Sequence, residues 1–86
     1  MQGDSDKKFD LLWESAINVA NQLGIIQQEN ISTGYIVLTI DSSKVWIRII
    51  RLTQAITRVR VSARRYHFPN IELSQDIFVK IVSEVR

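Results

Sequence analysis

The feature that most constrains this chain is the alternation of apolar and polar side chains between residues 35 and 64. Apolar residues recur there at every second position, which is the period of a β-strand that buries one face. The apolar positions are rich in β-branched residues, as is typical of strands. Short polar segments that favour turns interrupt the alternation. The sequence predicts three strands, at residues 35–40, 45–50 and 57–64, with turns at residues 41–44 and 52–55.

Alternate positions assign the side chains of these strands to two faces. The first face is wholly apolar, so other elements have to cover it. It holds Ile36, Leu38, Ile40, Val45, Ile47, Ile49, Val59, Val61 and Ala63. The second face mixes aromatic, aliphatic and basic side chains. It holds Tyr35, Val37, Thr39, Trp46, Arg48, Ile50, Arg58, Arg60, Ser62 and Arg64.

Two amphipathic helices flank the strands and can supply that cover. The first spans residues 9–23, where apolar residues recur three and four positions apart. Asp6 is its predicted N-cap, and Gly24 predicts a left-handed end. The second helix runs from Ile71 or Ser74 to Val85, with Asn70 or Ser74 as its N-cap.

The order of elements is thus α-β-β-β-α, in a chain of 86 residues that has room for one domain. We expect an α+β fold, in which a three-stranded antiparallel meander has both helices packed on its apolar face as a two-layer sandwich. Residues 1–8 are expected to form a flexible polar tail, and residues 25–30 a short connection that can hold a little extended structure. Residues 9–86 make up the single domain.

The distribution of charge along the chain says more about possible binding partners than the net charge of +2 does. Residues 42–71 hold seven of the eleven basic residues and no acidic residue, and such a local excess influences the choice of partner. Arginines on the mixed face would lie close together, because neighbouring strands are about 4.8 Å apart. Guanidinium groups suit phosphate and carboxylate, and aromatic rings offer stacking surfaces. The candidate binding residues are Arg48, Arg58, Arg60, Arg64, Trp46 and Tyr35.

Two interpretations of this basic face stay open. It can bind an anionic partner, such as nucleic acid, an acidic lipid headgroup or an acidic protein patch. Alternatively, the arginines keep an exposed face soluble while their stems cover its apolar side chains. Like charges on adjacent strands lower stability, which favours either an anionic partner or Glu and Asp side chains that reach in from the helix ends. The apolar residues Val37, Trp46 and Ile50 on the same face, together with the sheet edges, also allow a homodimer.

Catalytic and cofactor chemistry finds little support in the sequence. The absence of cysteine excludes disulfides, thiolate catalysis and cysteine-ligated metals. His67, the only histidine, has no acidic residue beside it and is a poor candidate for a metal ligand. No apolar run approaches the roughly 20 residues of a membrane helix, and residues 1–8 do not read as a signal peptide. We therefore expect no enzymatic activity, no cofactor and no metal.

Short motifs are spread over residues 9–86: Trp13, Leu23-Gly24, Thr33-Gly34, residues 44–48, residues 57–61 and residues 71–77. Together they resemble a family of small uncharacterised bacterial lipoproteins with a compact α-β-β-β-α domain. A looser resemblance is to the helix-and-sheet domains of BamC-type outer-membrane assembly lipoproteins. The resemblance implies a signal peptide and a lipidated N-terminal cysteine. This sequence shows neither, so the resemblance holds only if a longer precursor supplies them. The resemblance implies no catalytic residues.

The sequence therefore predicts a non-enzymatic domain of a cell-envelope lipoprotein, in the periplasm or anchored to the outer membrane. This domain would bind a protein or anionic partner through the mixed face of its sheet. The alternative is a small cytosolic nucleic-acid-binding module that uses the same basic face. Its order of strands and helices differs from that of the RNA-recognition motif, which makes nucleic acid the less favoured partner.

Overall fold

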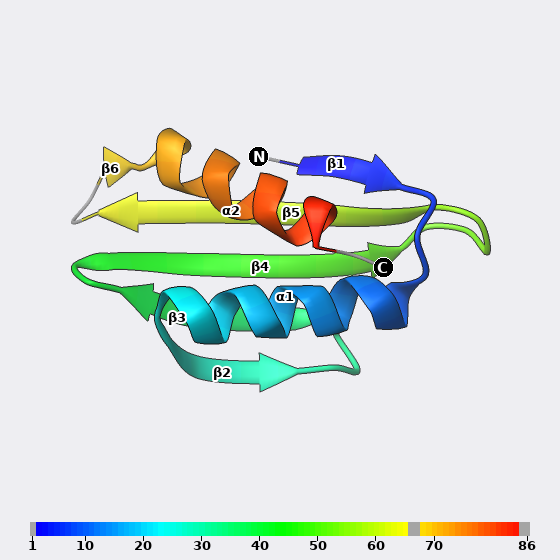
Figure 1. Ribbon diagram of the computed structural model, residues 1–86, viewed down its shortest axis with the longest axis horizontal. Coiled ribbons are helices and arrows are strands. Elements are labelled where there is room, and N and C mark those ends of the chain that lie inside the picture. The colour runs from blue at the N-terminus through cyan, green and yellow to red at the C-terminus, as the bar shows by residue number, and fades with distance from the viewer. Residues whose placement is uncertain (1, 66–67, 85–86) are drawn as a thin grey trace.

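The computed structural model of the chain describes residues 2–65 and 68–84. In chain order the elements are β1 (Gln2–Ser5), α1 (Phe9–Leu23), β2 (Ile25–Asn30), β3 (Tyr35–Ile40), β4 (Ser43–Arg51), β5 (Thr57–Arg65), β6 (Phe68–Pro69) and α2 (Ile71–Ser83). Antiparallel pairing gives the strand order β1-β5-β4-β3-β2, and β6 pairs with the far end of β5. Both helices lie on one face of the sheet and leave the other open (Figure 1). The expected α+β class, with both helices on one face, is confirmed.

The sheet is wider than the predicted three-stranded meander. That meander is present as β3, β4 and β5, but β2 forms from the expected connection and β1 from part of the expected flexible tail. Neither strand has the alternation of apolar and polar residues in its sequence that identifies a half-buried strand. Ile26 is the only residue of β2 that is even partly buried, and β1 consists of polar residues and Gly3. Both edge strands are therefore held largely by backbone hydrogen bonds to a neighbouring strand, which side-chain patterns do not reveal.

Burial confirms the predicted side-chain parity of the meander. Of the nine residues predicted to face inward, eight are buried and Ile40 is partly buried. The helices complete the core with Leu12, Ala16, Val19, Ala20, Ile77 and Ile81. Between the helices, the buried Ser15 hydroxyl donates a hydrogen bond to the carbonyl oxygen of Ile81 at 2.7 Å. This bond satisfies a polar group that would otherwise destabilise the core.

The helix ends differ in part from their predictions. Asn70 caps α2 as expected, because its side chain accepts a hydrogen bond from the backbone N–H of Leu73. The N-cap of α1 is Lys8 rather than Asp6, and no side chain caps it. Gly24 is extended, with φ of −164°, and is not left-handed. The reason for glycine there is space, since a Cβ would collide with the carbonyl oxygen of Thr39.

Two left-handed residues shape the ends of β3. Gly34 precedes the strand with φ of +69°, and a Cβ there would collide with the carbonyl oxygen of Ile49. The backbone N–H of Ile49 in turn donates to the Gly34 carbonyl at 2.8 Å. Asp41, with φ of +53°, lies in the two-residue turn that joins β3 to β4. These turns fix a register in which Tyr35 lies opposite Arg48.

Candidate functional site

The open face, meaning the sheet surface that the helices leave uncovered, carries most of the basic side chains of the meander. Cross-strand pairing aligns its side chains in rows that run across the strands. The rows are Tyr35, Arg48, Arg60 and Gln2; Val37, Trp46 and Ser62; and Thr39, Lys44 and Arg64. A fourth row holds Ile50, Arg58 and Asp4. Side chains opposite one another in a row lie close enough to interact directly.

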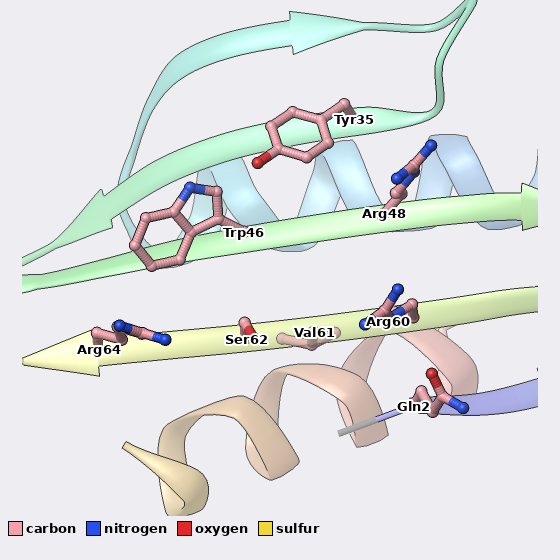
Figure 2. Close-up of a pocket in the computed structure, with 8 residues that line it drawn as sticks. All are labelled: Gln2, Tyr35, Trp46, Arg48, Arg60, Val61, Ser62 and Arg64. Carbon is pink, nitrogen blue, oxygen red and sulfur yellow. The ribbon is translucent and has the colours of Figure 1, made fainter. Parts of the chain in front are cut away.

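An open hollow of about 480 Å³ lies over these rows. Its lining residues, which we call the arginine hollow, are Gln2, Tyr35, Trp46, Arg48, Arg60, Val61, Ser62 and Arg64. Figure 2 shows Arg48 and Arg60 at one end and Arg64 at the other. Trp46 and Tyr35 stand on the β3 and β4 side, across from Ser62 on β5. Five of the six residues predicted to form the site thus come together here.

Arg58 is the predicted site residue that lies outside the arginine hollow. Its Nε donates a hydrogen bond to Oδ1 of Asp4 on β1 at 2.8 Å, and the two side chains form an ion pair. The hydrogen bond from Arg58 holds the pKa of the Asp4 carboxyl below its ordinary value, and the same bond raises the pKa of Arg58. Arg58 is therefore already neutralised by Asp4, a residue predicted to lie in a flexible tail.

The other three arginines have no such partner within residues 2–65 and 68–84. Arg48, Arg60 and Arg64 are exposed, and no described carboxylate lies within ion-pair distance of their guanidinium groups. Arg48 is directly opposite Arg60, and Arg64 is opposite Lys44. Two rows of the open face therefore place like charges on adjacent strands, an arrangement that lowers the stability of the free protein.

The aromatic side chains give the hollow a flat wall. Trp46 is partly buried, and its cross-strand neighbour Val37 is only 6% exposed although it belongs to the open face. The phenol of Tyr35 points toward the indole of Trp46 (Figure 2). The Nζ of Lys44 lies 5.5 Å from the centroid of the Trp46 ring, which is a cation–π contact. This wall offers apolar and stacking surface beside the free guanidinium groups.

Four residues of this region were absent from the predicted site: Gln2, Lys44, Val61 and Ser62. Lys44 lies two positions before Trp46 in β4, so both side chains point to the same face of the sheet. Extending the predicted strand by one residue toward the turn would have identified Lys44. Gln2 lines the hollow because β1 pairs with β5, with Gln2 opposite Arg60. No pattern in the first residues of the sequence indicates that pairing.

Other depressions have less chemical character. One of about 310 Å³ lies beside Arg48 at the far end of the meander, where the guanidinium of Arg51 stacks 5.3 Å from the ring centroid of Phe9. Another, of about 870 Å³, is a polar groove between the helices. In the part of the chain that the structure describes, no three potential metal ligands gather in one place. His67 lies outside the described residues.

Two sequence comparisons with known proteins find no match for this chain. A scan against protein-family models finds no matching family, and a search among curated proteins finds no similar sequence. None of the helices in the described residues is long and apolar enough to cross a membrane.

Proposed function

We propose that this protein is a non-enzymatic binding domain that holds an anionic partner on the open face of its sheet. The observation that carries the proposal is the contrast among four arginines on one face. Arg58 is neutralised by Asp4, whereas Arg48, Arg60 and Arg64 border one hollow and have no carboxylate partner among the described residues. Guanidinium groups that are not paired within the protein are free to bind carboxylate or phosphate.

A purely solubilising role explains this arrangement less well. Solubility requires exposed charge but does not require like charges directly opposite one another, which Arg48 and Arg60 are. It also does not require aromatic side chains among those charges. Tryptophan, tyrosine and arginine are the residues that contribute most to binding energy in protein interfaces. Their combination around one hollow supports binding as the function of this face.

We further propose that the domain works in the bacterial cell envelope, where its partner is a protein. The support for this location is the resemblance of its motifs to small bacterial lipoproteins. The coding sequence upstream of Gln2 tests it directly. A signal peptide followed by a lipid-accepting cysteine would support the proposal, and a cytosolic start at this position would refute it.

The binding proposal is tested by a charge-matched pair of variants. In the first, Arg48, Arg60 and Arg64 are replaced together by glutamine. In the second, three exposed lysines that do not line the hollow are replaced by glutamine, which removes the same net charge: Lys7, Lys8 and Lys80. Each protein is titrated with oligoglutamate and with oligodeoxythymidylate at low and moderate salt.

The proposal expects the arginine variant to lose binding to at least one polyanion and the lysine variant to retain it. Binding should weaken as the salt concentration rises, because the contacts are electrostatic. Equal loss in both variants would show that net charge and not the hollow determines binding. Absence of binding by the wild-type protein at low salt would refute the proposal altogether.

A further inference from the structure

Three open-face residues of β5 lie along the arginine hollow. Arg60, Ser62 and Arg64 are successive outward residues of that strand, with the two arginines at opposite ends of the hollow (Figure 2). Because a strand rises about 3.4 Å per residue, the Cα atoms of Arg60 and Arg64 are about 13–14 Å apart. Ser62 lies midway, opposite Trp46 on β4. The hollow thus has a cation at each end and an aromatic wall at its middle.

An extended polypeptide has the same repeat as the strand beneath it. Its residues i, i+2 and i+4 point to one side, and residues i and i+4 are also about 13–14 Å apart. Laid along β5, a segment with acidic residues at i and i+4 would bring one carboxylate to Arg60 and the other to Arg64 at the same time. Its residue i+2 would then lie over Ser62, beside Trp46 on β4. Arg48, which lies opposite Arg60, supplies a second guanidinium at one end.

We propose that the arginine hollow binds an extended acidic segment of a partner protein, in which two acidic residues lie four positions apart with an apolar or aromatic residue midway. This inference rests on the proposed function and adds the chemistry and the spacing of the partner. The volume of about 480 Å³ lies within the roughly 300–1,000 Å³ of clefts that hold small ligands. A short segment fits such a hollow better than a folded surface does.

Nucleic acid is the main competing ligand, and the charge of the whole molecule disfavours it. Binding of nucleic acid depends on many phosphate contacts, whereas this chain has a net charge of only +2. The helix layer carries exposed acidic residues: Asp10, Glu14, Glu72, Asp76 and Glu84. A long polyanion that extends beyond the hollow gains little attraction from such a molecule. A short segment with two negative charges can bind through the arginines of the hollow alone.

The test uses blocked pentapeptides and the folded chain labelled with ¹⁵N. The first peptide has glutamate at its first and fifth positions, phenylalanine at its third and threonine elsewhere. In the second peptide the second glutamate moves to the fourth position, and in a third both glutamates are glutamine. Binding is followed through the amide signals of β5 and the indole N–H signal of Trp46, which is assigned with Trp46→Phe. The protein variants are Arg60→Gln, Arg64→Gln and, as matched control, Arg58→Gln.

We expect the first peptide to bind about three- to tenfold more tightly than the second, because only its spacing engages both ends of the hollow with ionised hydrogen bonds. Arg60→Gln and Arg64→Gln should each remove that difference, while Arg58→Gln should keep it. Equal affinity for the first two peptides would overturn the proposed spacing. Tighter binding of oligodeoxythymidylate at the same residues would overturn the choice of a polypeptide partner and leave standing only the proposal that the open face binds an anionic partner. If the wild-type protein binds neither the peptides nor oligodeoxythymidylate, both the proposed acidic segment and the proposed binding function are refuted.

Discussion

The like charges of the open face allow a prediction whose sign is unusual for a surface mutation. Arg48 and Arg60 face each other on adjacent strands, and no described carboxylate separates or neutralises them. Opposed like charges at such a position destabilise a sheet by about 0.2–1 kcal/mol. Replacing Arg60 by glutamine keeps a long polar side chain and removes the repulsion. We therefore expect the free energy of unfolding to rise by about 0.2–1 kcal/mol, whereas most substitutions lower it.

Urea denaturation and thermal unfolding measure this effect. A gain of 1 kcal/mol would raise the melting temperature by about 4–8 °C in a domain of this size. A double-mutant cycle with Arg48→Gln isolates the coupling between the two arginines from the loss of their aliphatic stems. The coupling should be repulsive and should shrink in about 1 M salt, where the Debye length falls to about 3 Å.

The control is Arg58, which lies on the same strand and face but is paired with Asp4. Arg58→Gln removes an attraction, so it should give no increase in stability. An attractive or absent coupling between Arg48 and Arg60 would refute the reasoning, as would equal stabilisation by Arg58→Gln and Arg60→Gln. If Arg60→Gln stabilises the fold and weakens binding, the arginine is present for the partner and not for the fold.

Three further predictions concern the core, a turn and the ion pair of Asp4 with Arg58. Ile47 is completely buried in β4, and Ile47→Ala should lower the free energy of unfolding in urea by about 2–5 kcal/mol because it leaves a cavity. Gly34→Ala should cost at least about 1–2 kcal/mol by the same measurement, because alanine disfavours the left-handed backbone. At pH values above its ordinary pKa of 3.8, ionised Asp4 stabilises the folded state. This contribution is lost as the pH falls through the pKa of Asp4 in the folded protein, which is lower. The melting temperature should therefore decline over that acid range more in the wild type than in Asp4→Asn, and parallel declines would contradict the role of the ion pair with Arg58.

The central part of the fold could be predicted because its hydrophobic pattern is strong and local. In α1, apolar side chains repeat with the helical period, and in the meander they alternate with the strand period. Each pattern reflects one buried face, so burial of residues such as Leu12 and Ile47 follows from their sequence position alone. The same periodicity placed Trp46 on the opposite, open face.

The edge strands could not be predicted for a physical reason. In β2 only Ile26 is partly buried, and the remaining side chains are exposed. Strand β1 is only four residues long, and its residue types are equally common in turns and in flexible tails. Such strands depend on pairing with another strand: β1 pairs with residues 57–60 of the distant β5, and β2 pairs with β3, the next strand along the chain. That dependence leaves no periodic signal in the edge strand itself.

The candidate site was predictable to the level of side-chain direction and no further. In sequence, Arg58 and Arg60 are equivalent, because both are outward residues of the third predicted strand. What separates them is the residue that β1 sets opposite each one: Asp4 faces Arg58, and Gln2 faces Arg60. A carboxylate neutralises the first, and a neutral amide leaves the second free.

An acidic residue at position 2 would therefore neutralise Arg60 in the same way and leave Arg48 as the free guanidinium at that end of the hollow. The availability of Arg58 and Arg60 is decided by β1, an edge strand that the hydrophobic pattern cannot show.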